Sequence, residues 1–163
     1  MREGIFRMNE FEQSITINRA PEQVFKSVAD IEKMPKYLPA FHRIERQAGE
    51  RIRAEGEIMG YRFTQTGYCK SDDELRRMDF GSDDPAMSTG WLQVGPGPDL
   101  AAADVTVHLS LQIRPEQEEM IRTRFKNLEE MIGEGLRAAL RALKNYCEAQ
   151  EVSLDEADRA AST

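Results

Sequence analysis

The feature that most constrains this sequence is a long amphipathic stretch that runs from Pro115 to about Glu148. Apolar residues recur in it at steps of three and four positions, which is the spacing of one face of an α-helix. These positions are Ile121, Phe125, Leu128, Ile132, Leu136, Leu140 and Leu143. Such a helix would extend for about 50 Å, at about 1.5 Å per residue. Its apolar face therefore needs a broad surface to cover.

The chain before this helix predicts that surface as a set of strands. Turn-forming residues interrupt alternating apolar and polar segments at intervals of about 10–12 residues, which is typical of successive hairpins. The predicted strands are 10–18, 40–47, 50–58, 61–71, 74–82, 87–95 and 101–113. Pro21 and Asp30 predict the starts of two short helices after the first strand. Because seven antiparallel strands twist and curl, we predict an α+β fold in which a curved sheet wraps around the C-terminal helix.

Length and composition indicate one globular domain. The chain has 163 residues, 40% of them hydrophobic and 31% charged, which excludes a disordered chain and is enough for a single large core. We predict that this domain occupies residues 10–150. Residues 1–9 are expected to be an N-terminal leader, and residues 151–163, rich in acidic and small side chains, a flexible acidic tail.

Several partners and locations are disfavoured by the sequence. No apolar run approaches the roughly 18 residues of a membrane span, and the first residues lack the apolar core of a signal peptide. Two cysteines far apart in the chain fit a reducing compartment, so we expect a cytoplasmic protein. The net charge of −7 and the lack of a basic stripe argue against nucleic acid as a partner.

No motif for catalysis, metal binding or a cofactor stands out. His42 and His108 have no carboxylate or thiol at ligand spacing, so surface or packing roles are favoured and a metal site is not predicted. Cys69 and Cys147 lack a partner motif and are expected to be small buried residues rather than nucleophiles. We predict no cofactor, and the catalytic residues of any enzymatic activity remain unassigned.

Two glycines interrupt the long helix at Gly133 and Gly135. Each costs about 1 kcal/mol relative to alanine in a helix interior. Either the helix and a strand approach closely there, or the glycines leave room for a ligand under the helix. The residues alone favour neither alternative.

Two segments near the N-terminus resemble a known superfamily. Residues 14–25, Ser-Ile-Thr-Ile-Asn-Arg-Ala-Pro-Glu-Gln-Val-Phe, are similar to its strand followed by an Ala-Pro-x-x-Val-Phe helix start. Residues 28–39, Val-Ala-Asp-Ile-Glu-Lys-Met-Pro-Lys-Tyr-Leu-Pro, are similar to the turn that comes next. This is the START-like, or SRPBCC, superfamily, which has the helix-grip fold. The region 37–41 is also similar to the coenzyme Q-binding branch, with Phe41 in place of its Trp-Cys.

The resemblance implies a cavity between the sheet and the C-terminal helix that holds a small hydrophobic ligand. A lipid, an isoprenoid or quinone, or a polyketide-like molecule would suit it, bound by a monomer or homodimer. The alternatives are a polyketide cyclase or dehydrase acting in the same cavity, and an interaction module whose cavity is filled. The candidate cavity residues are Phe41, Tyr61, Phe63, Gln65, Met78, Phe80, Thr89, Trp91, Leu109, Leu128, Ile132, Gly135 and Leu136. From the residue types, Arg43, Arg77 and Gln65 are candidates for anchoring a carboxylate or a carbonyl group of a ligand.

Overall fold

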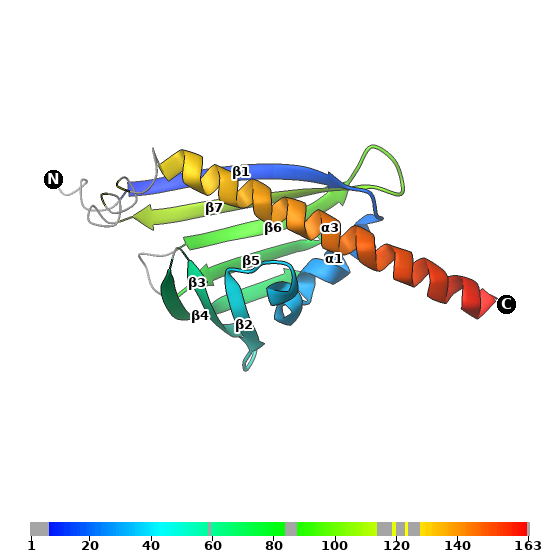
Figure 1. The fold of residues 1–163 in the computed structure, drawn as a ribbon, viewed down its shortest axis with the longest axis horizontal. Coiled ribbons are helices and arrows are strands. Elements are labelled where there is room, and N and C mark those ends of the chain that lie inside the picture. Colours follow the sequence, from blue (N-terminus) through cyan, green and yellow to red (C-terminus); the bar gives the residue numbers. More distant parts are fainter. Residues whose placement is uncertain are drawn as a thin grey trace.

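The computed structural model of the protein describes residues 7–58, 60–83, 88–113, 119, 123 and 128–162. In chain order they form β1 (Arg7–Ile17), α1 (Pro21–Ala29), the 3₁₀ helix η2 (Ile31–Lys36), β2 (Phe41–Arg46), β3 (Arg51–Ile58), β4 (Tyr61–Asp72), β5 (Arg77–Ser82), β6 (Ser88–Pro96), β7 (Ala103–Ile113) and α3 (Leu128–Ser162) (Figure 1). Pro21 occupies the first turn of α1, where its missing N–H costs nothing.

The strands form one antiparallel sheet of seven, in the order β1-β7-β6-β5-β4-β3-β2. This confirms the predicted α+β fold class, with a helix at the C-terminal end. The predicted strand ends are close to the observed ones. The largest differences are at β1, which begins at Arg7, and at β5, which begins at Arg77.

Alternation along the strands gives the sheet an inner face toward the helices and an outer face toward solvent. On the inner face Ile15 lies opposite Val105, which in turn lies opposite Val94. On the outer face Ser14 lies opposite Thr106, and their hydroxyl groups are 2.8 Å apart. The period-two pattern of the sequence thus separates core residues from solvent-facing residues.

The core lies between the sheet and two helices. α3 packs against β1, and α1 packs against β6, β7 and α3. Figure 1 shows α3 running diagonally along β1 and past α1. The buried apolar residues of this core include Ile17, Val24, Phe25, Val28, Met78, Leu92, Val94, Val105, Leu136, Leu140 and Leu143.

A polar contact fixes α3 to the end of β1. Lys144 Nζ lies 2.9 Å from the carbonyl oxygen of Thr16 and 2.7 Å from Glu148 Oε2. The backbone N–H of Asn18 donates to the same carboxylate oxygen at 2.9 Å. The hydrogen bond from Lys144, supported by that from Asn18, lowers the pKa of Glu148.

Glycines allow neighbouring strands to approach closely within the sheet. A Cβ atom at Gly67 would lie 2.0 Å from the carbonyl oxygen of Gly81 on β5. A Cβ atom at Gly56 would lie equally near the carbonyl oxygen of Ala40. No side chain fits at such distances, so these positions need glycine for the sheet to bend as it does.

The C-terminal helix continues beyond its predicted end. We expected a helix to Glu148 followed by a flexible tail, whereas α3 extends to Ser162. The reason is local, because neither glycine nor proline occurs after Gly135 to end the helix. The predicted start near Pro115 lies outside the described residues. None of the described helices is long and apolar enough to cross a membrane.

Candidate ligand-binding site

The inner face of the sheet divides into two halves. In the packed half, residues such as Val94, Val105 and Leu140 are almost completely buried. Toward the other end of the helix–sheet interface the side chains are only half-buried. We call this set the open half: Phe11, Gln13, Phe41, Phe63, Gln65, Phe80, Leu109 and Ile132. A clustered apolar surface that stays partly accessible is typical of a ligand-binding region.

Two phenylalanine rings in the open half reach over glycines of neighbouring strands. Phe63 on β4 is paired with Gly56, where a Cβ atom would be 2.7 Å from the ring atom Cζ. Phe80 on β5 is paired with Gly90, where a Cβ atom would be 3.0 Å from Cε1 and from Cζ. The tips of both rings therefore occupy the space that a side chain at the paired glycine would fill.

Phe41 completes this aromatic floor. Its ring meets that of Phe63 edge to face, with centroids 5.9 Å apart and planes inclined at 85°. This geometry suits the quadrupoles of the two rings. The three rings of the floor, those of Phe41, Phe63 and Phe80, are half-buried and line the open half.

The polar groups of the open half are amides. Gln13 on β1 and Gln65 on β4 point to the inner face, and neither has a hydrogen-bond partner among the described residues. The described inner-face positions of the seven strands carry no aspartate, glutamate or histidine. The open half can thus desolvate an apolar body and hydrogen-bond a polar group, but it offers no evident acid–base pair.

Eight of the predicted cavity residues lie on the inner side. Six belong to the open half, namely Phe41, Phe63, Gln65, Phe80, Leu109 and Ile132. Met78 and Leu136 are buried in the packed half, at 1% and 9% exposure. Tyr61 lies in β4 and Leu128 begins α3, but their side chains fall outside the described residues.

Thr89 and Trp91 lie on the outer face, which corrects their expected direction. The alternation of β6 points Leu92 and Val94 inward, so their neighbours point outward. The strand was placed correctly, but the wrong one of its two faces was assigned to the cavity. The two buried aliphatic residues were the better guide to the inner face than the larger aromatic ring.

On the outer face, the Trp91 ring is covered by side chains from the two neighbouring strands. Its centroid lies 5.4 Å from that of His108 on β7, with planes inclined at 4°. The guanidinium carbon of Arg77 on β5 lies 4.7 Å from the same ring, and Arg77 also pairs with Asp79. Arg77 is therefore an outer-face residue and not an anchor for a ligand in the open half. Arg43, the other candidate anchor, is exposed and paired with Glu45.

Gly135 also faces away from the sheet. It is exposed, and a Cβ atom built there would meet no atom within 4 Å. Gly133 is the buried glycine, with the Gln13 side chain 4.0 Å from its hypothetical Cβ. A Cβ atom at Gly133 would make only ordinary contacts, at 3.6–4.0 Å, with the ends of two side chains, so close approach of helix and strand does not require glycine there. The expectation that Gly135 lies above the ligand is corrected, because a two-residue step turns a helix by about 200°.

Phe11 and Gln13 are open-half residues that were not among the predicted cavity residues. The sequence contained the information needed to find them. Both share the alternation of Ile15 and Ile17 and therefore point to the same face of β1.

The cysteines and histidines match the roles predicted for them. Cys69 and Cys147 are free and buried, at 3% and 4% exposure. Burial raises the pKa of the Cys147 thiol to about 11, so the reactive thiolate is scarce at neutral pH. His42 is exposed, and His108 forms cross-strand contacts with Glu10 and Glu12. In the described part of the chain no three His, Cys, Asp or Glu side chains are grouped to hold a metal ion.

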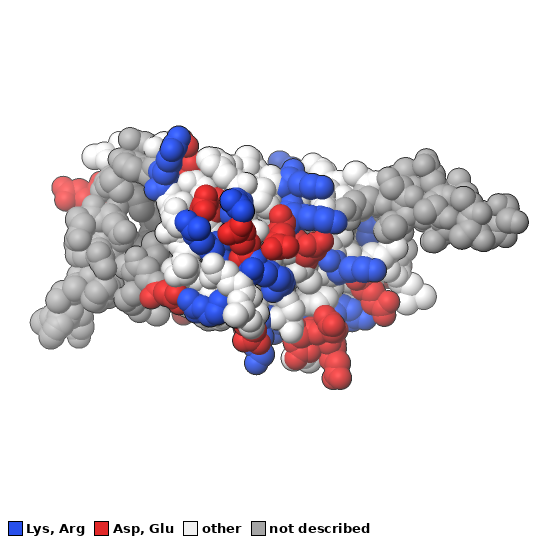
Figure 2. Space-filling model, turned by 90° about the horizontal axis from the view of Figure 1, so that it is seen from below, with Lys and Arg blue, Asp and Glu red and all other residues white. Residues whose placement is uncertain are grey.

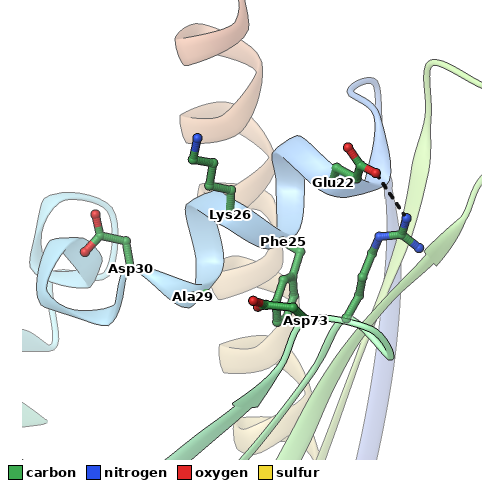
Figure 3. A pocket seen from close by; sticks show the side chains of 7 residues that line it. Glu22, Phe25, Lys26, Ala29, Asp30 and Asp73 are labelled. Carbon is green, nitrogen blue, oxygen red and sulfur yellow. Dashed lines mark ion pairs between the residues drawn. The ribbon is translucent and has the colours of Figure 1, made fainter.

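A separate pocket of about 650 Å³ lies between α1 and the β4–β5 turn. Its lining residues are Glu22, Phe25, Lys26, Ala29, Asp30, Asp73 and Arg76 (Figure 3). Arg76 Nη2 lies 3.8 Å from Glu22 Oε1. Charged groups of both signs at its rim make this pocket a poor match for an apolar ligand.

Comparison with known proteins agrees with the fold. The family model described as "Polyketide cyclase / dehydrase and lipid transport" matches residues 8–148. No curated protein sequence matches the chain.

Solved structures with the same fold differ widely from the chain in sequence. The Zhui aromatase/cyclase from a Streptomyces species has a TM-score of 0.72 and 16% identity, over 87% of this chain and 94% of its own. A protein from Thermus thermophilus has a TM-score of 0.71 and 21% identity, over 87% and 99%. A START superfamily protein from Mycobacterium smegmatis has a TM-score of 0.69 and 14% identity, over 86% and 98%. At these identities the similarity establishes the fold alone.

Proposed function

Because the chain belongs to the polyketide cyclase/dehydrase and lipid-transport family, we propose that it binds a small or medium-sized apolar molecule between the open half of the sheet and α3. The observation that carries this proposal is the uneven burial of the inner face. Leu109 and Phe80 are half-buried, whereas Val107 and Met78 on the same strands are buried.

The free energy of binding would come from covering the aromatic floor. Each 100 Å² of apolar surface removed from water contributes about 2.5 kcal/mol. The half-buried rings of Phe63 and Phe80 would contact the apolar body, and Gln65 would orient a polar group. A lipid, an isoprenoid or quinone, or a polyketide-like ring system fits these requirements.

A polyketide cyclase or dehydrase activity is the second candidate. The family description supports it, as does the fold shared with the Zhui aromatase/cyclase. Such an enzyme would preorganise its substrate on the aromatic floor and move a proton through a polar group. Binding ranks first because the inner-face positions described here lack a carboxylate or imidazole. A filled interaction module ranks third, because the open-half side chains are not fully packed.

We further propose that the protein is cytoplasmic and that its partner is a small ligand. Two buried free thiols suit the reducing cytoplasm. On the face seen in Figure 2, basic and acidic side chains are interspersed without a basic stripe. With a net charge of −7, this favours a small ligand over nucleic acid, bound by a monomer or homodimer.

The direct test is a titration with the neutral apolar fluorophore N-phenyl-1-naphthylamine. We expect saturable fluorescence enhancement by the folded protein, and about tenfold weaker binding to the Phe80→Ala variant, since tenfold corresponds to about 1.4 kcal/mol. Gly135→Phe is the matched control on the exposed side of α3 and should bind as the wild type does. Mass spectrometry of the organic extract would identify a co-purified ligand. The absence of saturable binding to folded protein would refute the proposal.

A further inference from the structure

A polar side chain interrupts the apolar inner series of β1 where the packed and open halves meet. Phe11, Ile15 and Ile17 follow the same alternation as Gln13, and all three are apolar. Gln13 lies opposite Val107, which is 9% exposed. Gln13 is only half-buried, so its amide remains accessible to water or to a ligand.

α3 brings a second donor to the same point. Measured from the hypothetical Cβ of Gly133, Arg137 Nη1 lies at 3.6 Å, Nη2 at 3.9 Å and Gln13 Nε2 at 4.0 Å. Arg137 is exposed, and its guanidinium group folds back one helical turn over Gly133. Gly133 is buried although it has no side chain of its own, because these groups cover it.

Among the described residues, neither Gln13 nor Arg137 has a hydrogen-bond or ion-pair partner. Other arginines of this acidic chain do have acceptors: Arg51 pairs with Asp83, and Arg77 pairs with Asp79. A guanidinium and an amide that both lie within 4.0 Å of the same position on α3 are suited to the two oxygens of a carboxylate.

We propose that Gln13 and Arg137 bind the carboxylate of an acidic amphiphile at the seam between β1 and α3. This inference rests on the proposed function, because the apolar part of the same molecule would lie over the open half. Phe11 and Leu109 pair across β1 and β7 on that side of Gln13. The ligand class is thereby narrowed from any apolar molecule to a carboxylic acid with a long apolar chain or ring system.

The test compares a fluorescent acid with its uncharged ester on the full-length protein. The probes are cis-parinaric acid and its methyl ester, at pH 7.4 and low salt. The wild type should bind the acid about tenfold more tightly than the ester. Arg137→Met should reduce affinity for the acid to that for the ester and leave the ester unchanged. Raising the salt concentration should also reduce the preference for the acid.

Two further variants separate a local contact from a change in net charge. Arg141→Met removes the same charge from an exposed position one helical turn away, and it should retain the preference for the acid. Gln13→Leu should lose part of the preference, because one donor is removed. The carboxylate site would be overturned if the wild type bound the acid and the ester equally well. It would also be overturned if Arg141→Met lost as much affinity for the acid as Arg137→Met. In both cases the proposal of apolar binding at the open half would stand. Failure of both probes to bind folded wild-type protein would overturn both proposals.

Discussion

Glycine has three different roles in this protein, depending on its surroundings. Gly67 lies where the carbonyl oxygen of Gly81 leaves no room for a Cβ atom. Gly56 and Gly90 are constrained in the same way by the carbonyl oxygens of Ala40 and His108, and each also lies beneath a phenylalanine ring of the neighbouring strand. Gly135 is exposed in mid-helix, with open space around it. The same residue type is thus required by sheet geometry, shapes the proposed ligand floor, or only weakens a helix.

Two alanine substitutions should consequently have opposite effects on stability. Gly67→Ala should destabilise the fold by about 2–4 kcal/mol, because the added methyl group meets backbone that cannot move aside without breaking strand pairing. Gly135→Ala should stabilise it by about 1 kcal/mol through helix propensity alone. Urea unfolding followed by circular dichroism measures both. A neutral Gly67→Ala would mean that the strands separate there at little cost.

At the scale of elements, the outer face of the sheet is stabilised without a covering helix. Arg77, Trp91 and His108 stack across β5, β6 and β7. His108 continues the series to β1, with Nδ1 3.0 Å from Glu12 Oε1 and Nε2 2.8 Å from Glu10 Oε1. Cross-strand pairs of this kind stabilise a sheet and fix its register.

This series of contacts makes stability depend on pH. The hydrogen bond to Glu12, and then that to Glu10, raises the pKa of His108 above its usual 6.5. Protonated His108 therefore favours the folded state. The stability that His108 contributes is fully present below pH 6.5, the pKa of the unfolded state. It is lost as the pH rises through the higher pKa of His108 in the folded state. Two further charged groups lie near His108, on the far side of Trp91: the guanidinium of Arg77 and the carboxylate of Asp79, which are paired with each other.

We expect His108→Gln to lower stability at pH 6 more than at pH 8. The difference should be about 0.5 kcal/mol, because the carboxylates are exposed and solvent screens the pair. Urea midpoints at the two pH values provide the measurement, and His42→Gln, at an exposed position on β2, is the control. An equal loss at both pH values would assign the role of His108 to stacking on Trp91 alone.

At the scale of the whole molecule, α3 is longer than the core it covers. The buried positions of α3 run from Gly133 to Cys147 in its described part. Figure 1 shows the C-terminal end of α3 projecting past the sheet. The contacts of Lys144 and Glu148 with β1 therefore lie near the end of the helix–sheet interface.

Removal of residues 151–163 should leave the folded domain intact. We expect a change in thermal midpoint of less than about 2 °C, since a loss of 1 kcal/mol shifts the midpoint of a domain this size by about 2–4 °C. Binding of the neutral fluorophore should also be unchanged. A large fall in the midpoint would show that the end of α3 has a partner, either in this chain or in a second copy.

The sequence by itself determined the elements and their order. Turn residues at intervals of about 10–12 positions located the strands, with period-two alternation clearest in the first and the last, and the series from Ile132 to Leu143 located the helix that covers them. The pairing of β1 with β7 did not follow from these patterns. For the elements and their order, the local pattern and the tertiary structure agree.

Tertiary structure alone decided which side chains form the candidate site. Trp91 and Leu92 alternate in one strand, and both are apolar enough for the inner face, so only pairing with β5 and β7 settles which of them points inward. Gly133 and Gly135 differ only in their angle about the α3 axis, which becomes meaningful once β1 lies against the helix. The meeting of Gln13 with Arg137 likewise joins two distant segments through packing. Periodicity shows which residues of one strand or helix share a face. Which element packs against that face depends on the complete fold.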